Sequence, residues 1–185
     1  MNFEHMIITL YFISLAIYGF TEIYLQRKYA KSNVEKQDSS FIFIVVPFYM
    51  SLYLTTFEYW LAKPLLHTGT LVAGFVLLYL GIIFRIVALL TLRQGFSRAI
   101  EAKADSKLVT SGVYKYVRHP LYSTVFIMAM SGSIIFSCTY CWLLVGITLW
   151  GLIFRIKKEE AFLIQQYSEY SEYSKRTKRI IPFIY

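Results

Sequence analysis

A histidine followed by a proline stands out among the residues that could do chemistry. His119 lies in the run Tyr114-Lys-Tyr-Val-Arg118-His119-Pro120-Leu-Tyr122, directly before an apolar stretch. Proline suits the first position of a helix, so this junction could be purely structural. The functional alternative is a polar cluster at one mouth of the protein. In that cluster the arginine, the histidine and two tyrosines would offer donors and aromatic faces to a polar ligand.

Two adjacent carboxylates form a second cluster. Glu159 and Glu160 follow Arg155 at the end of the last apolar stretch. They could simply be solvated acids favoured by a helix dipole. A carboxylate pair beside a basic mouth could instead bind an ammonium group. Arg155 and Glu159 are four residues apart and therefore share one helix face. They could pair with each other, or each could hold one part of a ligand.

Arg85 is an ionisable residue inside an otherwise apolar stretch. A buried charge within a membrane is a functional candidate by default. The alternative is that its long side chain reaches toward the basic segment that follows. We favour the functional interpretation.

Cys138 and Cys141 form a C-x-x-C pair in a short polar interruption of the apolar sequence. No second cysteine pair or histidine lies nearby in the sequence, so a zinc site has little support and we expect no metal. A local disulfide or chance spacing is the better interpretation.

The composition indicates what kind of scaffold positions these residues. Of the 185 residues, 57% are hydrophobic and only 16% are charged, yet the net charge is +8 and the mean hydropathy is +0.50. A soluble domain is about a quarter charged. The apolar content excludes disorder, and nucleic-acid binding is disfavoured because such proteins carry basic charge on a polar surface. The chain is therefore predicted to be a single membrane domain over residues 1–185.

A membrane-spanning helix needs about 20 mostly apolar residues. The predicted fold is accordingly all-α, with about five spanning helices and a C-terminal amphipathic helix. The predicted spans are residues 6–25, 41–61, 71–92, 121–136 and 140–156. Aromatic and apolar residues recur at three- and four-residue steps after the last span, which predicts an amphipathic helix over 157–179 at the membrane face.

The distribution of basic residues predicts the orientation. All but two of the 19 lysines and arginines, Lys63 and Arg85, fall in the segments 26–40, 93–118 and 155–179. Basic loops favour the cytoplasmic side of a membrane. Five crossings with the N-terminus outside and the C-terminus in the cytoplasm place all three segments on that side. The segment 93–120, which contains the histidine motif, is then a cytosolic loop.

Two separate blocks resemble the isoprenylcysteine carboxyl methyltransferase family. The first is the run from Leu108 to Tyr122. The second is the tail that begins at Arg155 and continues through Glu159-Glu160, Leu163, Tyr170, Tyr173, Arg176 and a closing Ile-Pro-Phe. The resemblance covers roughly residue 85 to the end. It implies a membrane enzyme that methylates the carboxylate of a prenylated cysteine with S-adenosylmethionine.

The resemblance also implies roles for individual residues. Most match positions that hold S-adenosylmethionine in the family: Tyr114, His119, Pro120, Tyr122, Leu108, Val109, Glu159 and, through a weaker match, Glu101. Arg155 matches an arginine at the substrate end, where Arg85 could assist it. One departure is Ser106, which stands where the family often has a histidine.

This chemistry is compatible with few ionisable residues. A carboxylate acceptor is already ionised at neutral pH, so methyl transfer to it requires no general base. Positioning and the exclusion of water can supply the catalysis. The lipid chain of the acceptor is expected to enter sideways from the bilayer. The host membrane would be the bacterial inner membrane or the endoplasmic reticulum.

Three alternatives remain open from the sequence alone. The first is a methyltransferase that acts on the nitrogen or sulfur of a phospholipid or small molecule. The second is an NADPH-dependent sterol-type reductase, which resembles this chain in its Arg-His motif but usually needs more spans. The third is a non-catalytic membrane scaffold whose basic face binds anionic lipid. The natural acceptor and the oligomeric state are not predicted.

Overall fold

A computed structural model describes residues 2–29, 41–92 and 108–180, and within these ranges the fold is all-helical, as predicted. An isolated bridge between Val117 and Lys178 is the sole β pairing in the described part of the chain. The helices are α1 (Phe3–Tyr29), α2 (Ile42–Ala62), α3 (Thr68–Leu92), the 3-10 helix η3 (Gly112–Lys115), α4 (Pro120–Ile135), α5 (Cys141–Gln166) and α6 (Tyr170–Arg176).

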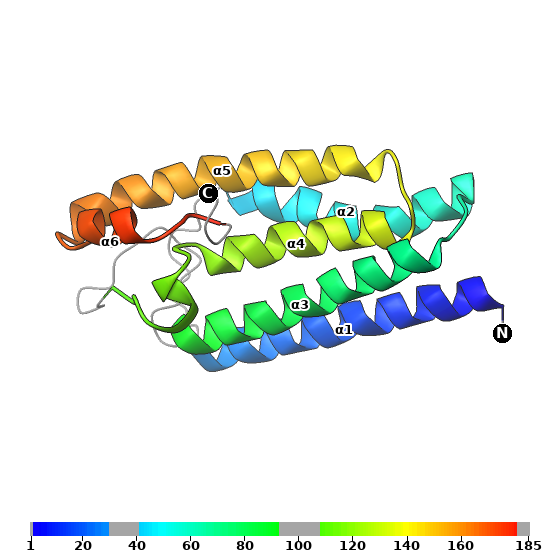
Figure 1. Cartoon of the computed structure of the whole chain (residues 1–185), viewed down its shortest axis with the longest axis horizontal. Helices are drawn as coiled ribbons and strands as arrows, with labels where there is room; N and C mark the ends of the chain where they lie inside the picture. The colour runs from blue at the N-terminus through cyan, green and yellow to red at the C-terminus, as the bar shows by residue number, and fades with distance from the viewer. Residues whose placement is uncertain (1, 30–40, 93–107, 181–185) are drawn as a thin grey trace.

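The long helices form an elongated bundle. Helix α4 packs against α3, α2 and α5, and α1 packs against α3 (Figure 1). Glycines allow two of the closest approaches. A Cβ on Gly74 of α3 would lie 2.8 Å from the backbone nitrogen of Ile135 in α4, and a Cβ on Gly151 of α5 would lie 2.6 Å from the carbonyl oxygen of Phe43 in α2. These helices therefore touch backbone to backbone, as is common between helices in a membrane.

Three helices are long and apolar enough to cross a membrane: Phe3–Lys28 within α1, then α2 and α3. They correspond to the first three predicted spans. Large hydrophobic side chains on these helices are exposed, including Phe20 and Trp60. A surface of this kind is costly in water and suits hydrocarbon. Helix α4 is apolar but has only 16 residues, and α5 carries five charged residues between Arg155 and Glu160. The chain is an integral membrane protein.

The prediction of one amphipathic helix over 157–179 is wrong. Helix α5 continues without a break to Gln166, and only then does the chain turn, at an extended Tyr167, into the short α6. The sequence contains neither proline nor glycine between 152 and 166, so nothing ends the helix at the predicted boundary. The charged residues after 156 therefore lie on the same continuous helix as the preceding apolar turns.

The polar elements gather at one end of the bundle. Helices η3 and α6, the start of α4 and the end of α5 lie together at the left of Figure 1, whereas the N-terminus and the turns α2–α3 and α4–α5 lie at the opposite end. Gly112 begins η3 with a φ of +58°, and a Cβ there would lie 2.9 Å from the Thr91 side chain. A glycine is thus required where the chain passes closely over α3 to reach the histidine motif.

Candidate active site

His119 stands at the N-terminal cap of α4, and Pro120 occupies the first helical turn. The imidazole is buried and stacks on Tyr122, with ring centroids 5.5 Å apart and an interplanar angle of 17°. Nδ1 lies 3.8 Å from Glu159 Oε2, and Nε2 lies 3.4 Å from Glu160 Oε1. Nevertheless Nε2 makes no hydrogen bond with any described residue. Proline therefore starts the helix, as the structural interpretation expects, while the imidazole faces the acidic pair.

The hydroxyl of Tyr122 connects the two candidate charges on α5. It donates a hydrogen bond to Glu159 Oε2 at 2.7 Å and accepts one from Arg155 Nε at 2.9 Å. Arg155 is buried, whereas the Glu159 side chain is 30% exposed. The sequence left open whether Arg155 and Glu159 pair with each other. In the structure a tyrosine hydroxyl bridges them, so that a cation and an anion lie on either side of one oxygen.

Glu160 has different surroundings from Glu159. Its carboxylate accepts hydrogen bonds from Arg118 Nε and Arg179 Nε, both at 2.9 Å. Burial alone would raise the pKa of this carboxyl, but the neighbouring His119 and Arg118 outweigh burial and lower the pKa to about 2. Glu160 is therefore an anion that joins three elements, while the more exposed Glu159 is available to a ligand.

The chain after α6 clamps the histidine motif. Arg118 N–H donates to the carbonyl of Lys178 at 2.8 Å, and His119 N–H donates to the carbonyl of Arg179 at 3.0 Å. The Arg118 guanidinium adds hydrogen bonds to the carbonyls of Ser174 and Thr177. The backbone that leads into α4 is thus fixed by a segment about sixty residues later in the chain.

Tyr114 is buried in η3 beside this cluster, and its carbonyl accepts a hydrogen bond from the Tyr173 hydroxyl at 2.6 Å. Burial and the negative charge of Glu159 raise the pKa of the Tyr114 hydroxyl, which remains a neutral donor at physiological pH. Leu108 and Val109 are half-buried in the segment that leads into η3. Glu101 and Ser106 lie outside the described residues, so the structure does not place them.

Arg85 does not join this group directly. Its Nε and Nη2 each lie 2.6 Å from an oxygen of Glu22 on α1, which forms a two-pronged ion pair. Its Nη1 lies 3.3 Å from the Leu121 carbonyl and 3.4 Å from Thr124 Oγ1, in the first turns of α4. The snorkelling alternative is not observed. The guanidinium instead joins α1 and α3 to the helix that carries Tyr122.

Sequence reasoning missed several partners of the site. Glu22 was visible as a charge near the end of a span, but nothing in the sequence paired it with Arg85. Arg118 was recognised only as a general donor, and Arg179 only as part of a basic tail. Both bind Glu160 across separations of 42 and 19 residues. One available signal was the excess of basic residues, because a carboxylate that becomes buried, as Glu160 does, needs cationic partners.

The arrangement could hold a polar ligand with charges of both signs. The partly exposed Glu159 can receive a cationic group, and the buried Arg155 can receive an anionic one. His119 Nε2 and the Tyr170 hydroxyl are buried without a hydrogen-bond partner among the described residues. Because buried polar atoms are nearly always paired, these two atoms indicate where a ligand would supply the missing contacts.

Comparisons with known proteins place the chain in a family. Residues 72–165 match the isoprenylcysteine carboxyl methyltransferase (ICMT) family, a segment that includes both α4 and the Arg155–Glu160 region. The protein-S-isoprenylcysteine O-methyltransferase of Saccharomyces cerevisiae is 30% identical over 176 residues, covering 86% of this chain and 72% of the yeast protein. The Dictyostelium discoideum protein of the same name is 32% identical over 129 residues, covering 66% of this chain and 54% of that protein.

A solved structure is similar as well. The eukaryotic intramembrane Ras methyltransferase ICMT has a TM-score of 0.66 and 25% identity, and the similarity covers 96% of this chain and 67% of that one. The chain spans only about half the length, or less, of the Dictyostelium and Schizosaccharomyces pombe relatives. With the family segment, the yeast relative and the shared fold taken together, this chain belongs to the isoprenylcysteine carboxyl methyltransferase family.

Proposed function

We propose that the protein transfers the methyl group of S-adenosylmethionine to the carboxylate of a lipophilic acceptor, an isoprenylcysteine. One observation carries the proposal. The Tyr122 hydroxyl holds the Arg155 guanidinium and the Glu159 carboxylate on either side of itself, at 2.9 and 2.7 Å. The ammonium group of S-adenosylmethionine would pair with an anion, and the acceptor carboxylate would pair with a cation. The site holds one such anion and one such cation side by side.

The residues present fit S-adenosylmethionine. Glu159 would pair with the ammonium of its methionine part, since the carboxylate is partly exposed and accepts a hydrogen bond from the neutral Tyr122 hydroxyl. His119 Nε2 and the Tyr170 hydroxyl lack a hydrogen-bond partner among the described residues and would bind its other polar groups. Tyr114 and the backbone at Leu108 and Val109 would line the opposite side. Glu101 would contribute from the segment before them.

When bound, S-adenosylmethionine supplies an electrophilic methyl group on a positively charged sulfur. Arg155 orients the acceptor carboxylate, which is ionised at neutral pH and needs no residue to remove a proton. The Tyr122 hydroxyl fixes the direction of the guanidinium and of Glu159, so that both charges are preorganised. The buried imidazole of His119 closes the site against water, which strengthens each of these interactions.

Arg85 is proposed to act as a positioning residue rather than to contact the acceptor. Its ion pair with Glu22 and its contacts with Leu121 and Thr124 hold the first turns of α4. Tyr122 lies in these turns. Arg85 would therefore fix the position of the Tyr122 hydroxyl relative to α5. It would affect catalysis indirectly, by positioning that hydroxyl.

The membrane is both the solvent of the protein and the source of the acceptor. The exposed apolar faces of α1, α2 and α3 would contact lipid, and the prenyl chain would enter sideways between helices. We propose five crossings with the N-terminus outside and the C-terminus in the cytoplasm. The candidate site then faces the cytoplasm, where S-adenosylmethionine and prenylated acceptors are made. The host membrane would be the bacterial inner membrane or the endoplasmic reticulum.

Calorimetric binding of S-adenosylmethionine to the detergent-purified full chain tests the proposal. We expect binding by the parent protein, and a loss of about tenfold or more for Glu159→Gln, since hydrogen bonds to charged groups contribute about 1.5–3 kcal/mol. His119→Ala should also bind more weakly. The matched control is Glu172→Gln, because Glu172 is an exposed acid on α6 paired with Lys175.

Transfer of a labelled methyl group to a farnesylcysteine analogue then tests the acceptor. Absence of S-adenosylmethionine binding by the folded parent protein would refute the methyltransferase proposal. Binding that persists unchanged in both site variants would leave the reaction class standing and refute the proposed site. Binding without transfer to the farnesylcysteine analogue would refute the proposed acceptor class.

A further inference from the structure

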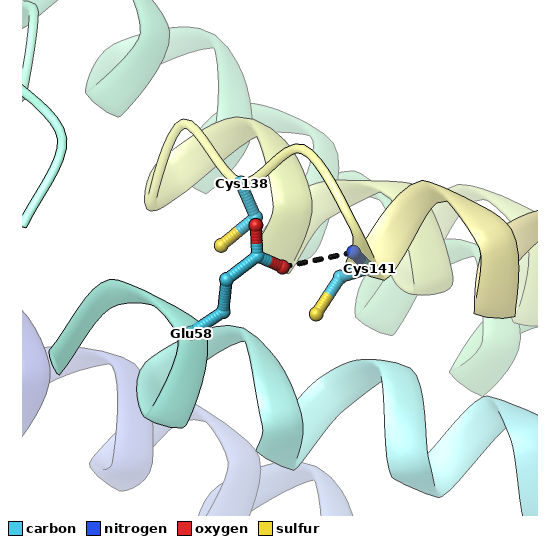
Figure 2. A group of neighbouring side chains, drawn as sticks. All are labelled: Glu58, Cys138 and Cys141. Carbon is cyan, nitrogen blue, oxygen red and sulfur yellow. Dashed lines mark hydrogen bonds between the residues drawn. The ribbon is translucent and has the colours of Figure 1, made fainter. Parts of the chain in front are cut away.

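Three potential metal ligands converge at the end of the bundle opposite the candidate active site. Cys138 lies in the turn between α4 and α5, Cys141 is the first residue of α5, and Glu58 lies near the C-terminal end of α2. Figure 2 shows the Glu58 side chain rising from α2 toward this turn, with its carboxylate between the two cysteines. Sequence spacing alone indicated no third ligand for the cysteine pair, because Glu58 lies eighty residues before Cys138. The fold supplies it.

The distances suit a small cation. One ligand atom from each residue, the two Sγ atoms and a carboxylate oxygen, lies within 4.8 Å of the others. In a tetrahedral zinc site with Zn–S near 2.3 Å and Zn–O near 2.0 Å, two sulfurs are about 3.8 Å apart and sulfur and oxygen about 3.5 Å apart. Adjustments of at most about 1.3 Å, within reach of side-chain rotation, would bring the three atoms to these separations.

The carboxylate is already held in place by backbone groups. Glu58 Oε1 accepts from the N–H groups of Thr139 and Tyr140 at 2.6 and 2.9 Å, and Oε2 accepts from Cys141 N–H at 2.9 Å. Ligands of bound metals are commonly oriented by such outer hydrogen bonds. Each carboxylate oxygen has further lone-pair capacity, and the Cys141 thiol already contacts this carboxylate. A cation could therefore take the place of the thiol proton without breaking the backbone contacts.

The metal complex would carry a small net charge near a favourable helix dipole. Two thiolates and one carboxylate around a divalent cation leave one net negative charge. This charge would lie at the N-terminus of the 26-residue helix α5, where the helix dipole stabilises anions and lowers the cost of forming thiolates. Both cysteines are free and buried, so both thiols are available as ligands.

We propose that Glu58, Cys138 and Cys141 bind a thiophilic divalent cation of the zinc class, with the fourth coordination position open to water. On binding, the two thiols release their protons to solvent and two Zn–S bonds and one Zn–O bond form. The ion joins the end of α2 to the α4–α5 turn. It lies far from the Tyr122 cluster, so its proposed role is structural and is independent of the methyl-transfer proposal.

Cobalt(II) is the direct probe of such a site. The full chain, purified in detergent without a histidine tag and kept reduced, is titrated with Co²⁺. We expect one equivalent to bind with a near-ultraviolet thiolate-to-cobalt absorption band and the visible bands of tetrahedral cobalt, and we expect Zn²⁺ to displace it. Protein purified without chelator should also contain close to one equivalent of zinc by elemental analysis.

Variants separate the ligands from their surroundings. Cys138→Ser and Cys141→Ser should each weaken the charge-transfer band and lower the affinity at least tenfold. Glu58→Gln, which keeps an acceptor oxygen for the backbone amides, should also lower the affinity. The control is His67→Ala, since His67 is an exposed potential ligand at the same end of the bundle. Its Co²⁺ spectrum and affinity should match those of the parent protein.

Several outcomes would overturn the proposal. A reduced, folded parent protein that binds no Co²⁺ or Zn²⁺, or an unchanged spectrum in both cysteine variants, contradicts it. So does a Cys138–Cys141 disulfide in freshly purified protein combined with failure to bind metal after reduction. If the serine variants do not fold, alkylation of the parent protein replaces them. Zn²⁺ should then protect both thiols at least tenfold against maleimide, and absence of protection refutes the site.

Discussion

Replacing Tyr122 with phenylalanine tests the central feature of the candidate site. The ring would keep its stacking on His119, whereas the hydroxyl that bridges Arg155 and Glu159 would be lost. Both lost hydrogen bonds involve a charged partner, and each such bond contributes about 1.5–3 kcal/mol. If the variant loses transition-state stabilisation equal to one of these hydrogen bonds, kcat/KM falls about 10- to 150-fold.

The assay is the initial rate of labelled methyl transfer to a farnesylcysteine analogue, measured at several S-adenosylmethionine concentrations. Because the hydroxyl positions two charges, we expect kcat to fall as well as KM to rise. The matched control is Tyr116→Phe, which removes the hydroxyl of a tyrosine that is 57% exposed. It should leave both constants within twofold of the parent values.

Two results would refute this reasoning. A Tyr122→Phe enzyme with parental kcat and KM would show that the bridge does not position the charges. A loss of activity matched by Tyr116→Phe would show that the effect is not specific to the bridge. The thermal midpoint of both variants should be recorded, because a Tyr122→Phe protein that unfolds at the assay temperature would mimic a catalytic loss.

Three further predictions concern stability, each measured from unfolding midpoints in detergent. The folded-state pKa of Glu160 is depressed to about 2, so its contribution is present above pH 4.5 and is lost as the pH falls through that range toward 2; Glu160→Gln should flatten this dependence, and an unchanged acid limb would contradict it. Arg85→Met should lower the free energy of unfolding by about 3–5 kcal/mol because it removes the cationic partner of the buried Glu22 carboxylate, whereas adding Glu22→Leu should recover most of the loss; a double variant no better than the single one would refute the ion-pair explanation. Gly151→Ala should lower the free energy of unfolding by about 1–3 kcal/mol, because its Cβ would meet a backbone carbonyl of α2. Gly146→Ala on the same helix meets nothing within 4 Å and should leave the free energy of unfolding unchanged. Equal effects of the two substitutions would contradict the close packing.

The features that could be predicted from the sequence are those encoded locally. Apolar length predicted α1, α2 and α3, and proline at the first helical position predicted the start of α4. The four-residue spacing of Arg155 and Glu159 correctly placed them on one face of a helix. Each of these depends on neighbours within about one or two helical turns, where sequence spacing translates directly into geometry.

The features that could not be predicted are contacts between distant segments. Glu58 reaches the cysteine turn across eighty residues, and Glu22 reaches Arg85 across 63. A single acidic residue in an apolar stretch indicates that its carboxylate needs a polar partner, but its position does not indicate which residue that partner is. The C-terminal end of α5 was predicted wrongly for another reason. A change from apolar to charged composition marks a change of solvent, and a helix can cross such a boundary unbroken.

The pairing of Val117 with Lys178 has a consequence for how the protein is made. Residues that hold the histidine motif leave the ribosome about sixty residues after the motif itself, which corresponds to roughly three to twelve seconds of synthesis. During that interval α5 is synthesised while the His119 backbone still lacks its partners. The candidate site is therefore completed only after the five long helices α1 to α5 have been made. A nascent chain would have no competent site to engage a cofactor or an acceptor before residues 178 and 179 have left the ribosome.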